Sequence, residues 1–126
     1  MEGVVDTNVL ISCLIIDDIN HQKAKEIMES LERWYLPTIV IHELVWFLKS
    51  QKLKIALAIP IIEHSKSLIV PIEKEDILFA LKNSAEKPSE YNDFLILGVA
   101  LRMKKELITF DEELKSNFKK FSKMYK

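Results

Sequence analysis

The sequence predicts an α/β protein with a parallel sheet that is covered by helices on both faces. Short apolar segments of three to five residues alternate with longer segments whose apolar residues recur at helical spacing. Glycine occurs only twice in 126 residues, where about 7% is usual, so we expect most of the chain to lie in helices or strands. No repeat or linker divides the sequence, which predicts one domain over residues 1–126.

The first third of the chain contains one expected strand and two expected helices. The strand covers residues 3–5, an apolar run that ends at Asp6. A helix is expected over residues 8–16. Asn20 is a typical N-cap residue, and it precedes a second expected helix over residues 21–33.

The middle of the chain repeats the pattern. A strand is expected at residues 34–36, followed by a long apolar helix over residues 38–50. A further helix over residues 53–66 contains Pro60. Proline removes a backbone donor and clashes with the preceding turn, so it should kink or split this helix.

The last part of the chain continues the alternation. Strands are expected at residues 68–70 and 106–110, and helices at residues 73–84, at residues 93–104 and from Asp111 onward. Ile77, Leu78 and Leu81 form one face of the helix at 73–84. Phe118 and Phe121 either pack in the last helix or belong to a short terminal strand. Alternating strands and helices imply right-handed crossovers and a parallel sheet.

Composition excludes several classes of protein. A single cysteine, Cys13, permits no internal disulfide and no zinc ligand set, and we interpret it as a small buried hydrophobic residue. No basic leader precedes the first apolar run, and no apolar run reaches the ~18 residues that a membrane span needs. We therefore expect a soluble cytoplasmic protein.

The overall charge does not indicate nucleic-acid binding, because 18 basic and 19 acidic residues give a net charge of −1. The distribution is less even: residues 115–126 contain five lysines and no acid. Lys115, Lys119 and Lys120 are candidates for contacts with a phosphate backbone. The alternative is a solvated face of a C-terminal helix.

Two acids follow expected strands. Asp6 comes directly after the first strand and Asp111 directly after the last one. Ligand sites of parallel sheets lie at the carboxyl ends of the strands. Each acid has a simpler interpretation as a helix cap; for Asp111 this has a specific form, since Thr109 and Glu112 have the spacing of a capping box.

Two further acids precede or interrupt apolar helices. Glu43 is the only formally charged residue between Arg33 and Lys49, so we expect a largely buried helix with one buried carboxylate. Such a carboxylate is costly unless it is paired or bound to metal. The alternative places Glu43 on a narrow exposed stripe. Asp93 precedes another apolar helix, where it could also act as a first-turn acid.

Together the four acids predict a metal site. Carboxylates at one end of a small sheet repel one another and raise each other's pKa. A divalent cation relieves that repulsion, and Mg²⁺ and Mn²⁺ prefer oxygen ligands. We therefore expect Asp6, Glu43, Asp93 and Asp111 to form a site for Mg²⁺ or Mn²⁺.

Four short motifs resemble those of PIN-domain nucleases, in the same order and at compatible spacing. They are Asp6-Thr7-Asn8-Val9-Leu10-Ile11, Leu36-Pro37-Thr38 with Ile41-His42-Glu43-Leu44, Tyr91-Asn92-Asp93-Phe94, and Ile108-Thr109-Phe110-Asp111. The similarity extends from Gly3 to about Leu114. The chain after Asp111 is short, so the family's usual last strand should be weak or absent.

The resemblance implies a Rossmann-like three-layer α/β/α PIN fold with a central parallel sheet of four or five strands. It implies Asp6, Glu43, Asp93 and Asp111 as catalytic and metal-binding acids, with Asn8 and Thr109 in supporting roles. It also implies a metal-dependent endoribonuclease that resembles VapC toxins, which form homodimers and are inhibited by a small antitoxin. Glu90, Asn92 and Glu112 are further polar residues near the motifs whose roles stay open.

Two alternatives to a toxin remain at this point. One is a housekeeping nuclease that processes RNA with the same chemistry. The other is a catalytically inactive PIN-like binding module, against which the four intact acids argue.

Overall fold

Four parallel strands form the sheet of this protein, whose computed structural model describes residues 1–124. The strands are β1 (Glu2–Val5), β2 (Arg33–Pro37), β3 (Ser67–Val70) and β4 (Glu106–Ile108). They lie in the order β3-β2-β1-β4, so β1 is central and β4 forms an edge. The register pairs Val4 with both Tyr35 and Leu107.

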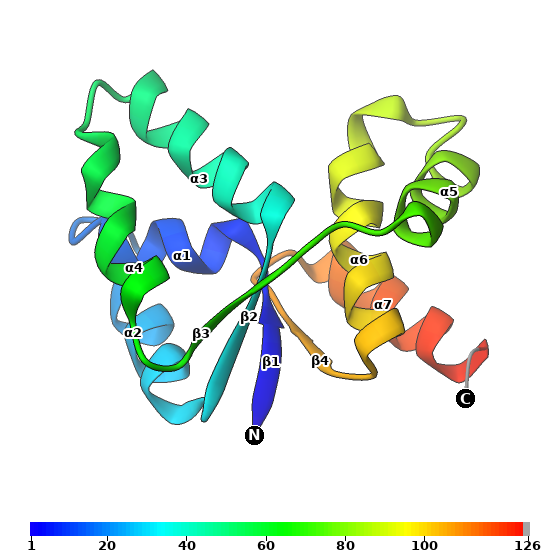
Figure 1. The fold of residues 1–126 in the computed structure, drawn as a ribbon, viewed down its shortest axis with the longest axis horizontal. Coiled ribbons are helices and arrows are strands. Elements are labelled where there is room, and N and C mark those ends of the chain that lie inside the picture. Colours follow the sequence, from blue (N-terminus) through cyan, green and yellow to red (C-terminus); the bar gives the residue numbers. More distant parts are fainter. Residues whose placement is uncertain (125–126) are drawn as a thin grey trace.

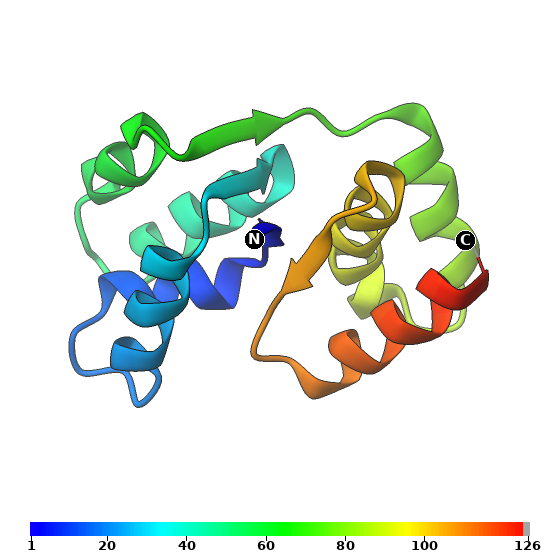
Figure 2. The same cartoon turned by 90° about the horizontal axis from the view of Figure 1, so that it is seen from below.

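The helices lie in two layers, one on each side of the sheet (Figures 1 and 2). One layer contains α1 (Thr7–Leu14), α2 (His21–Ser30), α3 (Thr38–Ser50), the 3₁₀ helix η1 (Ile55–Ala58) and α4 (Ile59–Glu63). The other contains α5 (Lys74–Asn83), the 3₁₀ helix η2 (Pro88–Glu90), α6 (Tyr91–Met103) and α7 (Glu112–Met124). The expected three-layer α/β/α architecture is confirmed.

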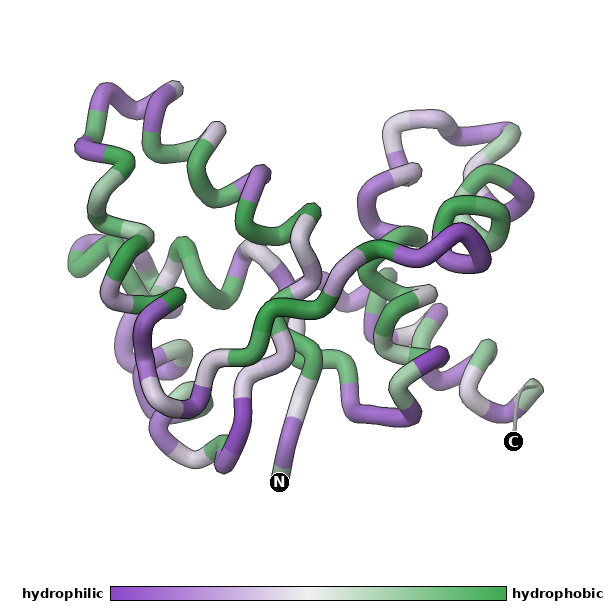
Figure 3. Tube along the Cα trace, viewed as in Figure 1, coloured by the Kyte–Doolittle hydropathy of each residue, from purple (hydrophilic) through white to green (hydrophobic). Residues whose placement is uncertain are grey.

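The core lies between the sheet and these layers. Val4 and Val5 of β1 and Leu36 of β2 are fully buried. Helix α6 is buried without interruption from Phe94 to Ala100, and it forms an apolar segment of the hydropathy trace (Figure 3). Burying one such aliphatic or aromatic side chain contributes about 1.5–3 kcal/mol, so α6 anchors its layer to the sheet.

The large aliphatic residues of α5 lie away from its contact with α6. Ile77, Leu78 and Leu81 are 39–53% exposed, whereas Ala80 is fully buried. Helix α5 packs on α6 beside Gly98, where an added Cβ would lie 3.2 Å from the Phe79 ring. Small residues at this contact allow close approach of the two helices, and the large aliphatic side chains remain on the outer face.

Three further expected elements differ from their predicted extent or are decided by the structure. The helix expected at 53–66 is divided into η1 and α4, with Pro60 in the first turn of α4. The strand expected at 106–110 ends at Ile108. Phe118 and Phe121 lie in α7, and the described residues contain no fifth strand.

Phe121 shows why α7 is a packed helix. Its ring contacts Phe79 edge-on at a centroid distance of 5.3 Å and Phe94 at 6.4 Å. Cys13 is a free thiol that packs partly buried against the core. No helix within residues 1–124 is long and apolar enough to cross a membrane.

Candidate active site

The four predicted acids converge at the carboxyl end of the sheet. All four line one groove of about 640 Å³. Asp6 follows β1, Asp111 lies in the connection from β4 to α7, Glu43 projects from α3, and Asp93 lies in the first turn of α6. The central position of β1 brings acids from both helical layers to the same place.

Asp6 is held by hydrogen bonds to the start of α1 and to the end of β4 and the residue that follows it. It is 6% exposed. Its Oδ1 accepts a hydrogen bond from the Thr7 backbone N–H at 2.7 Å, and its Oδ2 accepts one from the Thr109 hydroxyl at 2.7 Å. Its own backbone N–H donates to the Ile108 carbonyl at 2.9 Å, which continues the pairing of β1 with β4. Asp6 is therefore both the N-cap of α1 and a groove residue.

Thr109 links three groups of the site. Besides donating to Asp6, its Oγ1 accepts hydrogen bonds from Asn8 Nδ2 at 3.2 Å and from the Asp111 backbone N–H at 3.0 Å. The side-chain oxygen Oδ1 of Asn8 accepts from the Phe110 backbone N–H at 3.2 Å. Asn8 and Thr109 thus fasten the start of α1 to the loop that carries Asp111, which fits the supporting roles expected for them.

Asp111 itself caps α7. Its Oδ1 accepts a hydrogen bond from the Leu114 backbone N–H at 3.1 Å. The Thr109 hydroxyl donates to Asp6 and does not cap the helix. The Glu112 side chain forms an ion pair with Lys115 at 3.4 Å. The capping box of Thr109 and Glu112, which was the alternative interpretation for Asp111, is therefore not formed, because Asp111 itself occupies the cap position.

Glu43 is half-buried and hydrogen-bonded on both oxygens. The Thr7 hydroxyl donates to Oε1 at 2.6 Å, and Asn92 Nδ2 donates to Oε2 at 3.2 Å. Sequence analysis did not identify Thr7, although it stands next to Asp6 in the first motif. Asn92, whose role was open, orients Glu43.

The expectation of a largely buried α3 is wrong. Only Val40, Leu44 and Leu48 are buried, while Trp46 is 70% exposed. The residues of α3 that line the groove are Ile39, His42, Glu43, Trp46 and Phe47. Because these positions repeat at intervals of three and four residues, they share one helical face. Helix α3 therefore has one apolar face toward the core and a second, mixed face toward the groove, on which Ile39, Trp46 and Phe47 lie beside polar groups.

Two of the acids have strongly raised pKa values. Burial raises the pKa of Asp6 from 3.8 to about 6, although its hydrogen bonds from Thr109 and Thr7 oppose the rise; Glu43 and Asp111 add repulsion. Burial also raises the pKa of Asp93 to about 6, with repulsion from Asp6, Asp111, Glu43 and Glu90. The acids therefore interact electrostatically, as the sequence predicted.

The donor chemistry of the groove fits a hard divalent cation. All four acids offer oxygen ligands, and a cation would offset the burial and repulsion that disfavour the charged carboxylates. Within residues 1–124, however, no group of three or more acidic, histidine or cysteine side chains is arranged so that it could hold a metal ion.

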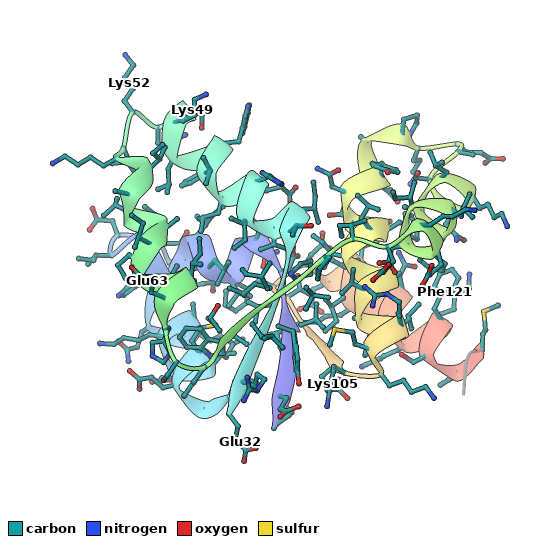
Figure 4. All side chains as sticks on the ribbon, in the orientation of Figure 1. Glu32, Lys49, Lys52, Glu63, Lys105 and Phe121 are labelled. Carbon is teal, nitrogen blue, oxygen red and sulfur yellow. The ribbon has the colours of Figure 1, made fainter. Side chains whose placement is uncertain are left out.

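The predicted lysines do not lie around this groove. Lys115 and Lys119 line a second groove of about 900 Å³ together with Lys104, Lys105 and Lys123. Figure 4 shows Lys105 near the start of β4, at the sheet end away from α3. Lys120 lies with its Nζ 5.7 Å from the centre of the Phe121 ring.

Comparisons with known proteins agree with this architecture. VapC20 of Mycobacterium tuberculosis, a sarcin-ricin loop cleaving toxin, superposes with a TM-score of 0.80 and 15% identity over 93% of this chain and 95% of its own. VapBC2 from Rickettsia felis, solved with a DNA fragment from their promoter, superposes with a TM-score of 0.65 and 18% identity over 92% of each chain. A sequence comparison with curated proteins returns no match. The model of the PIN domain matches residues 3–120, and the chain therefore belongs to the PIN-domain family of nucleases.

Proposed function

We propose that the protein is a metal-dependent endoribonuclease that hydrolyses RNA phosphodiester bonds in the groove of the four acids. The observation that carries this proposal is the convergence of Asp6, Glu43, Asp93 and Asp111 in one groove of a PIN fold. Acids with raised pKa values in a shared groove are typical of functional sites, since such a cluster costs stability without a ligand.

The cofactor is Mg²⁺ or Mn²⁺, held by Asp6, Asp93 and Asp111. When bound, the metal lowers the pKa of a water molecule and stabilises charge on the phosphoryl oxygens. Glu43 holds or orients the attacking water, and its carboxylate is fixed for this role by Thr7 and Asn92. Thr109 fixes the orientation of Asp6, and Asn8 fixes Thr109.

Substitution of the acids tests this activity. We expect Asp6→Asn to abolish cleavage of RNA with Mg²⁺ or Mn²⁺, and Glu43→Gln to lower kcat about a hundredfold or more. Asp17→Asn is the matched control, because Asp17 is an exposed acid outside the groove. Full activity of pure Asp6→Asn protein would contradict the assignment. An inactive parent protein would instead favour the binding-module alternative.

The biological role that we propose is that of a VapC-like toxin with a small antitoxin partner, acting as a homodimer. The similarity of the fold to VapC20 and VapBC2 supports it. A tagged copy expressed with its genomic neighbours tests it: co-purification of a small protein that suppresses cleavage supports a toxin. Cleavage unaffected by any neighbour favours an RNA-processing enzyme.

Lys115, Lys119 and Lys120 remain candidates for RNA contacts. Lys115 and Lys119 lie in the second groove rather than beside the acids. In this proposal they contact phosphates of RNA that extends beyond the cleavage site.

A further inference from the structure

The two tryptophans of this chain lie in opposite environments. Trp34 is 7% exposed, donates its indole N–H to the Met28 carbonyl at 2.8 Å and stacks on His64 at 4.2 Å. Trp46 is 70% exposed. Within residues 1–124, no hydrogen bond, ring contact or cation contact involves the Trp46 side chain. The packing of the fold therefore explains the position of Trp34, but it does not explain why Trp46 is exposed.

Trp46 belongs to the wall of the catalytic groove. It lies three residues after Glu43 on α3, and both line the groove. Residues three apart on a helix are neighbours on one face, with Cβ atoms about 5–6 Å apart. Ile39 and Phe47 line the same groove, so the indole shares it both with apolar side chains and with the acids.

The charge of this groove limits how RNA can bind there. Four carboxylates line it, and none of its described lining residues is a lysine or an arginine. Phosphate contacts to basic side chains, which supply most affinity in other nucleic-acid complexes, are therefore missing next to the acids. A nucleobase has an uncharged flat face that stacks on aromatic side chains whatever the base.

We propose that Trp46 binds substrate by stacking on an unpaired nucleobase next to the cleaved bond. This inference rests on the proposed ribonuclease activity and adds a substrate-binding residue to it, one that needs an exposed base face beside the cleaved bond. In a duplex the base faces are covered by neighbouring base pairs, so they are not available to the indole.

Tryptophan fluorescence tests the contact without catalysis. The parent protein is titrated in EDTA with a short mixed-sequence oligoribonucleotide, either single-stranded or annealed to its complement. We expect quenching by the single strand, little quenching by the duplex, and loss of most quenching in Trp46→Phe, whose remaining Trp34 is buried. Equal quenching in Trp46→Phe, or no quenching of the parent, would overturn the proposal.

Steady-state kinetics test the role in cleavage. Trp46→Ala and Trp46→Leu should raise KM about tenfold with little change in kcat, since stacking holds the substrate but performs no chemistry. Trp46→Phe should recover part of the loss, because it retains an aromatic face. Ile19→Ala is the control, since Ile19 is 96% exposed and lies outside the groove.

The outcomes separate this inference from the activity on which it rests. If Asp6→Asn protein cleaves as the parent does, the proposed active site fails. If Asp6→Asn is inactive while Trp46→Ala retains the KM of the parent, only the stacking role fails.

Discussion

Asp6 combines a structural role with a functional one. Its carboxylate caps α1 and receives the Thr109 hydroxyl, yet burial raises its pKa to about 6. The hydrogen bonds therefore compensate only part of the cost of burying the charge. The residue is held in place by the fold but opposes the stability of the fold at neutral pH.

The first prediction concerns Asp6 and pH. In the unfolded chain the carboxyl group releases its proton near pH 3.8, and in the folded chain near pH 6. Between these pH values the folded state thus binds more protons than the unfolded state. The stability that Asp6 contributes below pH 4 is therefore lost as the pH rises through 6. Asp6→Asn should raise the free energy of unfolding at pH 8 by up to about 3 kcal/mol, with little gain at pH 4.

Urea unfolding in EDTA at the two pH values checks this. Asp17→Asn should leave stability unchanged at both. A loss of stability in Asp6→Asn of the same size at pH 4 and pH 8 would show that lost hydrogen bonds, and not the charge, dominate.

The second prediction concerns Thr109. Thr109→Val preserves shape but removes the hydroxyl that donates to Asp6 and accepts from Asn8 and Asp111. We expect a loss of about 1–3 kcal/mol. The bond from Thr109 lowers the pKa of Asp6, so the acid limb of the pH–rate profile should move to higher pH. Thr109→Ser should behave like the parent, and a profile unmoved in Thr109→Val would argue against coupling to Asp6.

At the scale of elements, one buried ion pair joins α5 to α6. Arg102 Nη2 lies 2.9 Å from Asp76 Oδ2, and the Asp76 side chain is only 2% exposed. Arg102 also donates to the Pro71 carbonyl at 3.1 Å. The pair fixes the position of α6, and α6 carries Asp93 and Asn92 into the groove.

The third prediction tests this pair. Arg102→Met leaves the buried Asp76 carboxylate without its partner, which should cost about 3 kcal/mol or more. Lys105→Met breaks the more exposed pair with Glu2, whose side chains are 35% and 32% exposed, and should cost clearly less, because solvent screens an exposed pair. Urea unfolding at neutral pH measures both. Equal costs would mean that burial does not distinguish the two pairs.

At the scale of the whole molecule, the site is assembled from segments far apart in the sequence. Parallel pairing of β1 with β4 brings Asp6 to the loop that contains Asp111. Glu43 comes from one helical layer and Asp93 from the other. A ligand that contacts all of these acids therefore bridges both layers and should stabilise the entire fold.

The fourth prediction follows from this bridging. Mg²⁺ or Mn²⁺ should raise the Tm of the parent protein, because a ligand that binds only the folded state stabilises it by about 2.7 kcal/mol at one hundred times its Kd. A protein carrying both Asp6→Asn and Asp93→Asn should show no rise. Sodium chloride at equal ionic strength controls for screening. A Tm that is unchanged at millimolar metal would contradict the metal site.

The fifth prediction concerns the proposed homodimer. Ile77, Leu78 and Leu81 form an exposed apolar face on α5, and covering such a face favours association. Leu81→Asp should convert the dimer into a monomer without lowering stability of the monomer, as measured by light scattering. Ile19→Asp should leave the mass unchanged. A parent protein that is monomeric would contradict the proposal.

The sequence by itself determined the order of the elements and the identity of the four acids. Periodicity identified every strand and the long helices, since apolar spacing reports which side of an element is buried. Boundaries were less accurate: the helix expected at 21–33 ends at Ser30, because Arg33 begins β2. The acids stood out because each interrupts or ends an apolar segment. Metal binding and the catalytic roles stay predictions.

Only the tertiary structure decided which faces are covered. Helix α3 was expected to be largely buried, but its second, mixed face lines the groove and exposes Trp46. The exposure of the outer face of α5 and the second groove beside the lysines likewise could not be predicted from the sequence. The sequence shows which side chains are apolar and which of them share a face. The packing of distant segments determines whether another part of the chain covers that face.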